Sequence, residues 1–83
     1  MKFEWDDVKN DSNKRKHGIG FEDVLPLFES GNYAIEFDDE NSTLDEDRWI
    51  ARGAISGVGR VVVVFIEIID GETIRIISAR KGE

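Results

Sequence analysis

One apolar run, Arg60 to Ile69, limits the folds open to this chain more than any other segment. Its central part, Val61 to Ile66, has the length of a β-strand and is far too short to cross a membrane. Successive strand residues point to opposite faces of a sheet, so a strand that is apolar throughout needs cover on both faces. We therefore predict a central strand that is covered on both sides.

The flanking segments predict the rest of one sheet. The strands that we expect beside Arg60 to Ile69 are Phe3 to Trp5, Tyr33 to Asp38, Arg48 to Ser56 and Thr73 to Arg80. Strict alternation places Tyr33, Ile35 and Phe37 on one face of a half-buried strand. Gly57-Val58-Gly59 closes one strand, and Asp70-Gly71 indicates a two-residue hairpin.

Two helices are expected near the N-terminus. Asp6 is a candidate N-cap, and the basic residues before Gly18 indicate that a first helix runs from Asp7 to His17. This helix has few apolar residues, so we expect its ends and its neighbours to stabilise it. Apolar residues at helical spacing predict a second helix; they are Phe21, Val24, Leu25 and Phe28. Pro26 near its start predicts a kink or a short first turn.

The resulting order, β-α-α-β-β-β-β, predicts an α+β fold with the two helices packed on one face of a mainly antiparallel sheet. Residues 1–83 are expected to form a single domain. The chain has no cysteine, which excludes disulfides, thiolate catalysis and Cys-based metal sites. Its charged N-terminus lacks the apolar core of a signal peptide, so we expect a cytoplasmic protein with no membrane partner.

Charge is unevenly distributed along the chain. The net charge is −7, which argues against a nucleic-acid ligand at first sight. Residues 1–47 hold fourteen acids and five bases, however, whereas residues 48–83 hold four acids and six bases. A local basic face on the sheet half therefore remains compatible with the composition.

Residue chemistry alone leaves the function open. Guanidinium groups such as Arg48 and Arg75 suit phosphate, but strand arginines are more often ordinary surface residues. His17 is either a proton-transfer group or a helix-end cation, and position favours the latter. The acid-rich loop from Asp38 to Asp47 lacks the spacing of an EF-hand. Arg75 is expected to share a strand face with Ala79. Arg80 is expected to lie on the other face unless a bulge intervenes.

Short motifs in both halves of the chain form a recognisable series. The first half has Phe3-Glu4-Trp5-Asp6, Lys9, Asn13, Lys16-His17-Gly18-Ile19 and Phe21-Glu22. The second half has Glu46, Arg48-Trp49-Ile50-Ala51, Gly53, Val61 to Phe65, Glu67 and Ile74-Arg75-Ile76-Ile77-Ser78-Ala79-Arg80-Lys81. This series resembles the BrnT family, the ribonuclease toxins of bacterial type II toxin–antitoxin systems, over essentially the whole chain.

The resemblance implies a RelE-like fold and metal-independent, cofactor-free cleavage of RNA that inhibits translation. It also implies a cognate ribbon-helix-helix antitoxin of the BrnA type, in a 2:2 assembly, with a toxin homodimer as the other possible state. The implied catalytic residues are His17, Glu46, Arg48, Arg75 and Arg80, and the implied substrate-binding residues are Lys16, Trp49 and Lys81. His17 and Glu46, with Glu67 behind them, are unranked candidates for proton transfer.

Two other functions stay open. The family pattern has an arginine where this chain has Ala54, and it continues past Lys81 into a basic helix. A catalytically inactive toxin-fold protein that binds a partner is therefore the alternative, and an orphan domain that dimerises through Trp49 or Tyr33 is a third. The enzyme hypothesis expects Arg48, Arg75 and Arg80 to converge in one concave patch.

Overall fold

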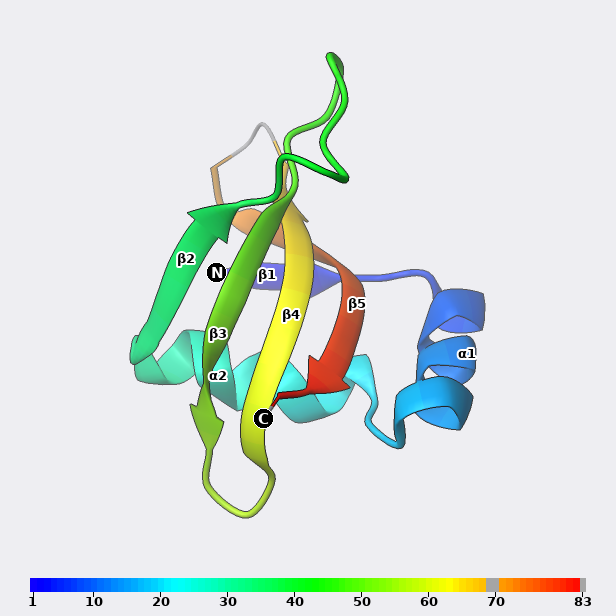
Figure 1. Cartoon of the computed structure of the whole chain (residues 1–83), viewed down its shortest axis with the longest axis vertical. Coiled ribbons are helices and arrows are strands. Elements are labelled where there is room, and N and C mark those ends of the chain that lie inside the picture. The colour runs from blue at the N-terminus through cyan, green and yellow to red at the C-terminus, as the bar shows by residue number, and fades with distance from the viewer. Residues whose placement is uncertain (69–70, 83) are drawn as a thin grey trace.

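A computed structural model describes residues 1–68 and 71–82 and shows a five-stranded sheet with helical segments behind it and beside it (Figure 1). The elements in chain order are β1 (Lys2–Glu4), α1 (Asp7–His17), the 3₁₀ helix η1 (Phe21–Val24), α2 (Leu25–Ser30), β2 (Tyr33–Phe37), β3 (Trp49–Ile55), β4 (Gly59–Glu67) and β5 (Thr73–Lys81). The strand order is β1-β5-β4-β3-β2.

The sheet confirms the predicted α+β class and element order. β1 pairs with β5 in parallel, and the other three neighbouring pairs are antiparallel. β4 is the central strand, as the apolar run predicted. Asp70, half of the expected Asp70-Gly71 hairpin, lies outside the described residues, as does Ile69, the expected end of the apolar strand.

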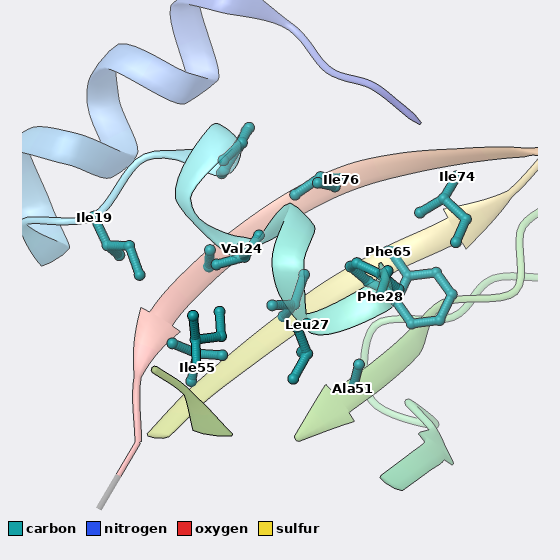
Figure 2. Close-up of a cluster of buried hydrophobic side chains, with 13 residues drawn as sticks. Ile19, Val24, Leu27, Phe28, Ala51, Ile55, Phe65, Ile74 and Ile76 are labelled. Atoms are coloured by element: carbon teal, nitrogen blue, oxygen red, sulfur yellow. The ribbon is translucent and has the colours of Figure 1, made fainter. Parts of the chain in front are cut away.

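The second helical segment is split at its proline. η1 carries Phe21 and Val24, and α2 begins at Leu25 with Pro26 in its first turn, where a missing backbone N–H costs little. The apolar side chains of both pieces enter the core with Phe65, Ile74 and Ile76 of the sheet (Figure 2). The expected short first turn is thus a separate 3₁₀ helix.

A close approach of α2 to β3 explains one glycine. A Cβ on Gly53 would lie 2.6 Å from Cδ1 of Leu27 and 3.0 Å from the carbonyl oxygen of Asn32. The first distance is shorter than real Cβ contacts allow, so only glycine lets the helix pack this closely on the strand.

The second face of β4 corrects one prediction. The core face carries Val61, Val63 and Phe65, all buried under the helical segments. On the opposite face Val62 is buried, but Val64 and Ile66 are only half-buried and no helix covers them. Cover on both sides was therefore a wrong expectation: long side chains from neighbouring strands are enough to shield this face in part.

Polar side chains hold α1 against the edge of β5. Asp6 caps the helix through hydrogen bonds from the backbone N–H groups of Val8 and Lys9, and Gly18 ends it in the left-handed conformation (φ 69°). The buried Asn13 side chain donates to the carbonyl oxygens of Ile19 and Ala79 and accepts from the Ala79 N–H. The Asn13 amide thereby satisfies the backbone groups of Ala79 in the part of β5 that the short β1 does not reach.

Candidate functional site

A β-bulge in β5 decides which arginines share a face. Along β4, Val62 faces Arg80 and Ile66 faces Arg75, with a register shift between Val64 and Phe65. Directly opposed residues point to the same face, so the extra residue places Arg75 and Arg80 together on the face without helices. Ala79 faces the core instead, which corrects the expectation that it shares a face with Arg75.

Four cations surround a concave surface at the end of β5, which we call the cationic groove. It encloses about 670 Å³ and is lined by Arg52, Gly53, Ala54, Arg60, Val61, Val62, Arg80, Lys81 and Gly82. None of these residues is acidic. The backbone hydrogen bond from Gly82 to the Arg60 carbonyl oxygen (2.8 Å) fixes the end of β5 against β4 at this point.

The cations of the groove differ in how far they are neutralised. The Nε of Arg52 lies 2.8 Å from Oε1 of Glu36, and this pair is about half exposed to solvent. Within residues 1–68 and 71–82, Arg60, Arg80 and Lys81 take part in no ion pair. Three positive charges are therefore free to meet an anion.

Two of the groove arginines were missed as site residues in the sequence. Ala54 pairs with Arg60 and Arg52 pairs with Val62 across the β3–β4 hairpin. Counting outward from the Gly57-Val58-Gly59 turn would have placed Arg52, Ala54 and Arg60 on one face. The sequence analysis placed strands without fixing their register, so this signal went unused.

Arg48 and Arg75 do not line the groove, which contradicts the expectation of one shared patch with Arg80. Arg75 lies opposite Ile66, four residues along β4 from Val62, or roughly 13 Å from the groove end. It is paired with Glu4 at 2.8 Å, and Arg48 is paired with Glu46 at 3.1 Å. Each is thus partly neutralised by a carboxylate of its own.

The proton-transfer candidates lie in two places. Glu46 and Glu67 line a second concavity of about 580 Å³, away from the cationic groove, together with Asp45, Asp47 and Trp49. We call it the acidic cleft. His17, beside Lys16, is exposed at the end of α1, and α1 and β5 run in the same direction in Figure 1. Of the three candidates, His17 is the one at the end of the molecule where Arg80 lies.

Trp49 faces the core side of the sheet and not the side of the groove. It pairs with Phe65 across the sheet and makes an edge-on ring contact with Phe37 at a centroid distance of 5.3 Å. Trp49 lies between the Phe37 ring and the acidic cleft and does not line the cationic groove.

One ion pair with a perturbed pKa joins the first two helical segments. Nζ of Lys14 lies 2.6 Å from Oε1 of Glu22, and the Asn10 side chain donates a second hydrogen bond to Glu22 at 2.8 Å. These donors lower the pKa of Glu22 to about 2, and the same contact raises the pKa of Lys14. The pair lies outside the groove and fixes α1 to η1.

In the described part of the chain, no three His, Asp or Glu side chains gather in a way that would hold a metal ion. No helix within it is long and apolar enough to cross a membrane.

Comparison with known proteins places this geometry in context. The model of a family described as the ribonuclease toxin, BrnT, of type II toxin–antitoxin systems matches residues 5–83. The crystal structure of the Brucella abortus ribonuclease toxin BrnT superimposes with a TM-score of 0.77 at 28% sequence identity, covering 100% of this chain and 97% of that one. A search of curated proteins gives no match.

Proposed function

This chain belongs to the BrnT family of ribonuclease toxins of type II toxin–antitoxin systems, and we propose that it is a single-domain, metal-independent RNA endonuclease whose cationic groove binds the scissile phosphate. The observation that carries the proposal is the groove itself: its described lining holds four cations, of which only Arg52 is paired with a carboxylate. Such cleavage would inhibit translation, and a cognate antitoxin would neutralise it.

The chemistry follows from the charges in the groove. Arg80 and Arg60 hold the non-bridging oxygens of the scissile phosphate, and guanidinium forks suit this task because they donate two parallel hydrogen bonds. Lys81 pairs with Val61 and adds positive charge from the end of β5. A base removes the proton of the neighbouring 2′-hydroxyl, whose oxygen then bonds to phosphorus while the bond to the 5′-oxygen breaks. The products are a 2′,3′-cyclic phosphate and a 5′-hydroxyl, because the departing 5′-oxygen takes up a proton. Negative charge grows on the phosphate during this step, and fixed cations stabilise it.

His17 is our assignment for proton transfer, because the groove lining contains no group that exchanges protons near neutral pH. Lys16 beside it would add positive charge at the RNA backbone. Arg75 lies further along the face without helices, and we assign it to the flanking RNA backbone. Arg48 is paired with Glu46 of the acidic cleft, so we do not assign it to RNA. Glu46 pairs with Arg48 and Trp49 faces the other side, so we assign neither to the reacting phosphate.

The test is cleavage of a single-stranded RNA by the purified chain in the presence of EDTA. We expect cleavage by the wild type, and a loss of at least 100-fold in Arg80→Ala and Arg60→Ala, because each removes a charge that stabilises the transition state. Lys9→Ala, an exposed cation on α1, is the matched control and should keep full activity. An RNA with 2′-deoxy groups should resist cleavage. Intact RNA with a well-folded wild type would contradict the enzyme assignment, and activity that EDTA abolishes would contradict metal independence.

The alternative, an inactive toxin-fold protein that binds a partner, finds its support in Ala54. This residue lines the groove opposite Arg60 and contributes no charge. If the wild type binds RNA but does not cleave it while Ala54→Arg does, the missing cation accounts for the loss and the chain is a binding module.

A further inference from the structure

An apolar stripe on the edge strand of the sheet is only partly covered by the described chain. We define the β2 stripe as Tyr33, Ile35 and Phe37, which share the core-side face of β2. Ile35 is 50% exposed and Phe37 is 42% exposed, although their cross-strand partners Ala51 and Trp49 are buried or half-buried. Contiguous exposed apolar patches are uncommon on monomeric proteins, and the larger ones mark interaction sites.

The stripe is open because the covering helix is short. α2 has six residues, and its Phe28 ring covers Tyr33 and Phe65 at centroid distances of 5.3 Å each. No described helical segment packs over Ile35 and Phe37, further along β2 (Figure 1). β2 is also an outer strand of the sheet, so one side of its backbone has no neighbouring strand.

The β2 stripe ends beside the acidic cleft. Phe37 contacts the Trp49 ring, and Trp49 also lines the acidic cleft. The described lining of that cleft carries the carboxylates of Asp45, Glu46, Asp47 and Glu67 and no lysine or arginine. A ligand that lies along the stripe with its end in the cleft therefore meets apolar side chains first, and then carboxylates beside an indole ring.

We propose that the β2 stripe and the acidic cleft together bind a segment of the cognate antitoxin that is apolar on one side and carries an arginine or lysine at one end. This inference rests on the proposed function only in that the family supplies an antitoxin partner. Carboxylates around the cleft complement a cation, and the faces of Trp49 and Phe37 suit a guanidinium group. RNA would be repelled there, and a second copy of this chain would bring a net charge of −7 of its own.

The two surfaces of the molecule then have separate tasks. The β2 stripe faces the core side of the sheet, whereas the groove residues Arg52 and Arg80 face the opposite side. A substitution in the stripe should therefore release the antitoxin without changing how the free chain treats RNA.

The test is co-expression of the chain with the product of the gene adjacent to its own, followed by measurement of the affinity of the purified pair. We expect Ile35→Lys and Phe37→Ser to weaken the complex at least tenfold, and the double change Asp45→Asn/Asp47→Asn to weaken it less and to reduce its sensitivity to salt. Val8→Ser is the matched control, because Val8 is 75% exposed on α1, far from β2 in the sheet order. Ile35→Thr keeps a β-branched residue and serves as the second variant if Ile35→Lys melts below the wild type.

Each other outcome overturns the assignment. No complex with the wild-type chain, or a complex that the stripe variants leave unchanged, contradicts docking at this surface. A homodimer of the free chain that Ile35→Lys dissociates would assign the stripe to a second copy. RNA cleavage by the free chain is measured in parallel. A chain that binds the antitoxin through the stripe but does not cleave RNA contradicts the ribonuclease assignment and not the docking surface. A chain that cleaves RNA but does not bind the antitoxin through the stripe contradicts only the docking surface.

Discussion

At the scale of single residues, the least expected feature is that asparagine side chains, and not apolar ones, fix α1 to the rest of the protein. Val8, the only branched aliphatic of this helix, points to solvent, and the buried positions are Asn10 and Asn13. Asn10 accepts from the Phe21 N–H and donates to Glu22, so every polar atom of both amides that is buried has a partner in the described residues. The few apolar residues of this helix predicted that contacts with neighbouring elements hold it in place. The burial of the two asparagines could not be predicted, because a polar helix residue is expected to be exposed unless its hydrogen-bond partners are known.

Replacing Asn13 with alanine should destabilise the fold by about 2–4 kcal/mol, because it leaves the Ala79 N–H and two carbonyl oxygens buried without partners. Urea unfolding followed by circular dichroism measures this change. Lys9→Ala on the exposed side of the same helix should stay within about 0.5 kcal/mol of the wild type. Equal effects of the two substitutions would show that the Asn13 hydrogen bonds do not hold α1.

At the scale of elements, the sequence predicted what depends on short-range pattern and missed what depends on register. The cap at Asp6, the end at Gly18 and the period-two strands all follow from neighbouring residues, and the structure has them. The bulge in β5 does not: Ile77 resembles its neighbours, and only the pairing with β4 shows that it is the extra residue. Because a one-residue shift exchanges the faces of a strand, the positions of Arg75 and Ala79 could not be predicted without it.

The junction between α1 and η1 should make stability depend on pH. Glu22 has a folded-state pKa of about 2 against an ordinary 4.5, so its ionised form stabilises the fold fully above about pH 4.5 and loses this contribution as the pH falls toward 2. Both side chains of the Lys14–Glu22 pair are nearly half exposed, so solvent screening keeps the effect on stability small.

The measurement is the melting temperature of the wild type and Glu22→Gln between pH 2 and 7. Glu22→Gln should melt lower at pH 7, and the difference should shrink as the pH approaches 2. Glu29→Gln removes an exposed carboxylate of α2 that lies outside the ion pairs of the described chain, and it should follow the wild-type profile. A difference between Glu22→Gln and the wild type that stays constant over this range would assign the effect to packing and not to charge.

At the scale of the whole molecule, opposite charges lie at opposite ends of one small sheet. The cationic groove lies where β4 begins and β5 ends and holds Arg60 and Arg80, whereas the acidic cleft lies at the other end of β4 and holds Glu67. The unequal halves of the sequence indicated a separation of charge along the chain. They could not show that the sheet converts it into two charged ends, because that step requires the strand order and the register.

This separation predicts how RNA affinity depends on salt in a chain whose net charge is −7. Each phosphate that a groove cation neutralises releases counterions, so the logarithm of affinity falls with the logarithm of salt concentration by about 0.7 per contact for a single strand. With the scissile phosphate in the groove and two flanking phosphates at Lys16 and Arg75, we expect a slope of about −2. Arg60→Ala removes one cation from the scissile phosphate and should reduce the slope by up to about 0.7. Asp45→Asn/Asp47→Asn at the other end of the sheet should raise affinity at low salt and leave the slope unchanged, because it adds no phosphate contact. Fluorescence anisotropy with a labelled, non-cleavable 2′-deoxy strand measures both quantities. A slope near zero, or one that Arg60→Ala does not alter, would mean that the groove is not where the phosphates bind and that the net negative charge governs the whole surface.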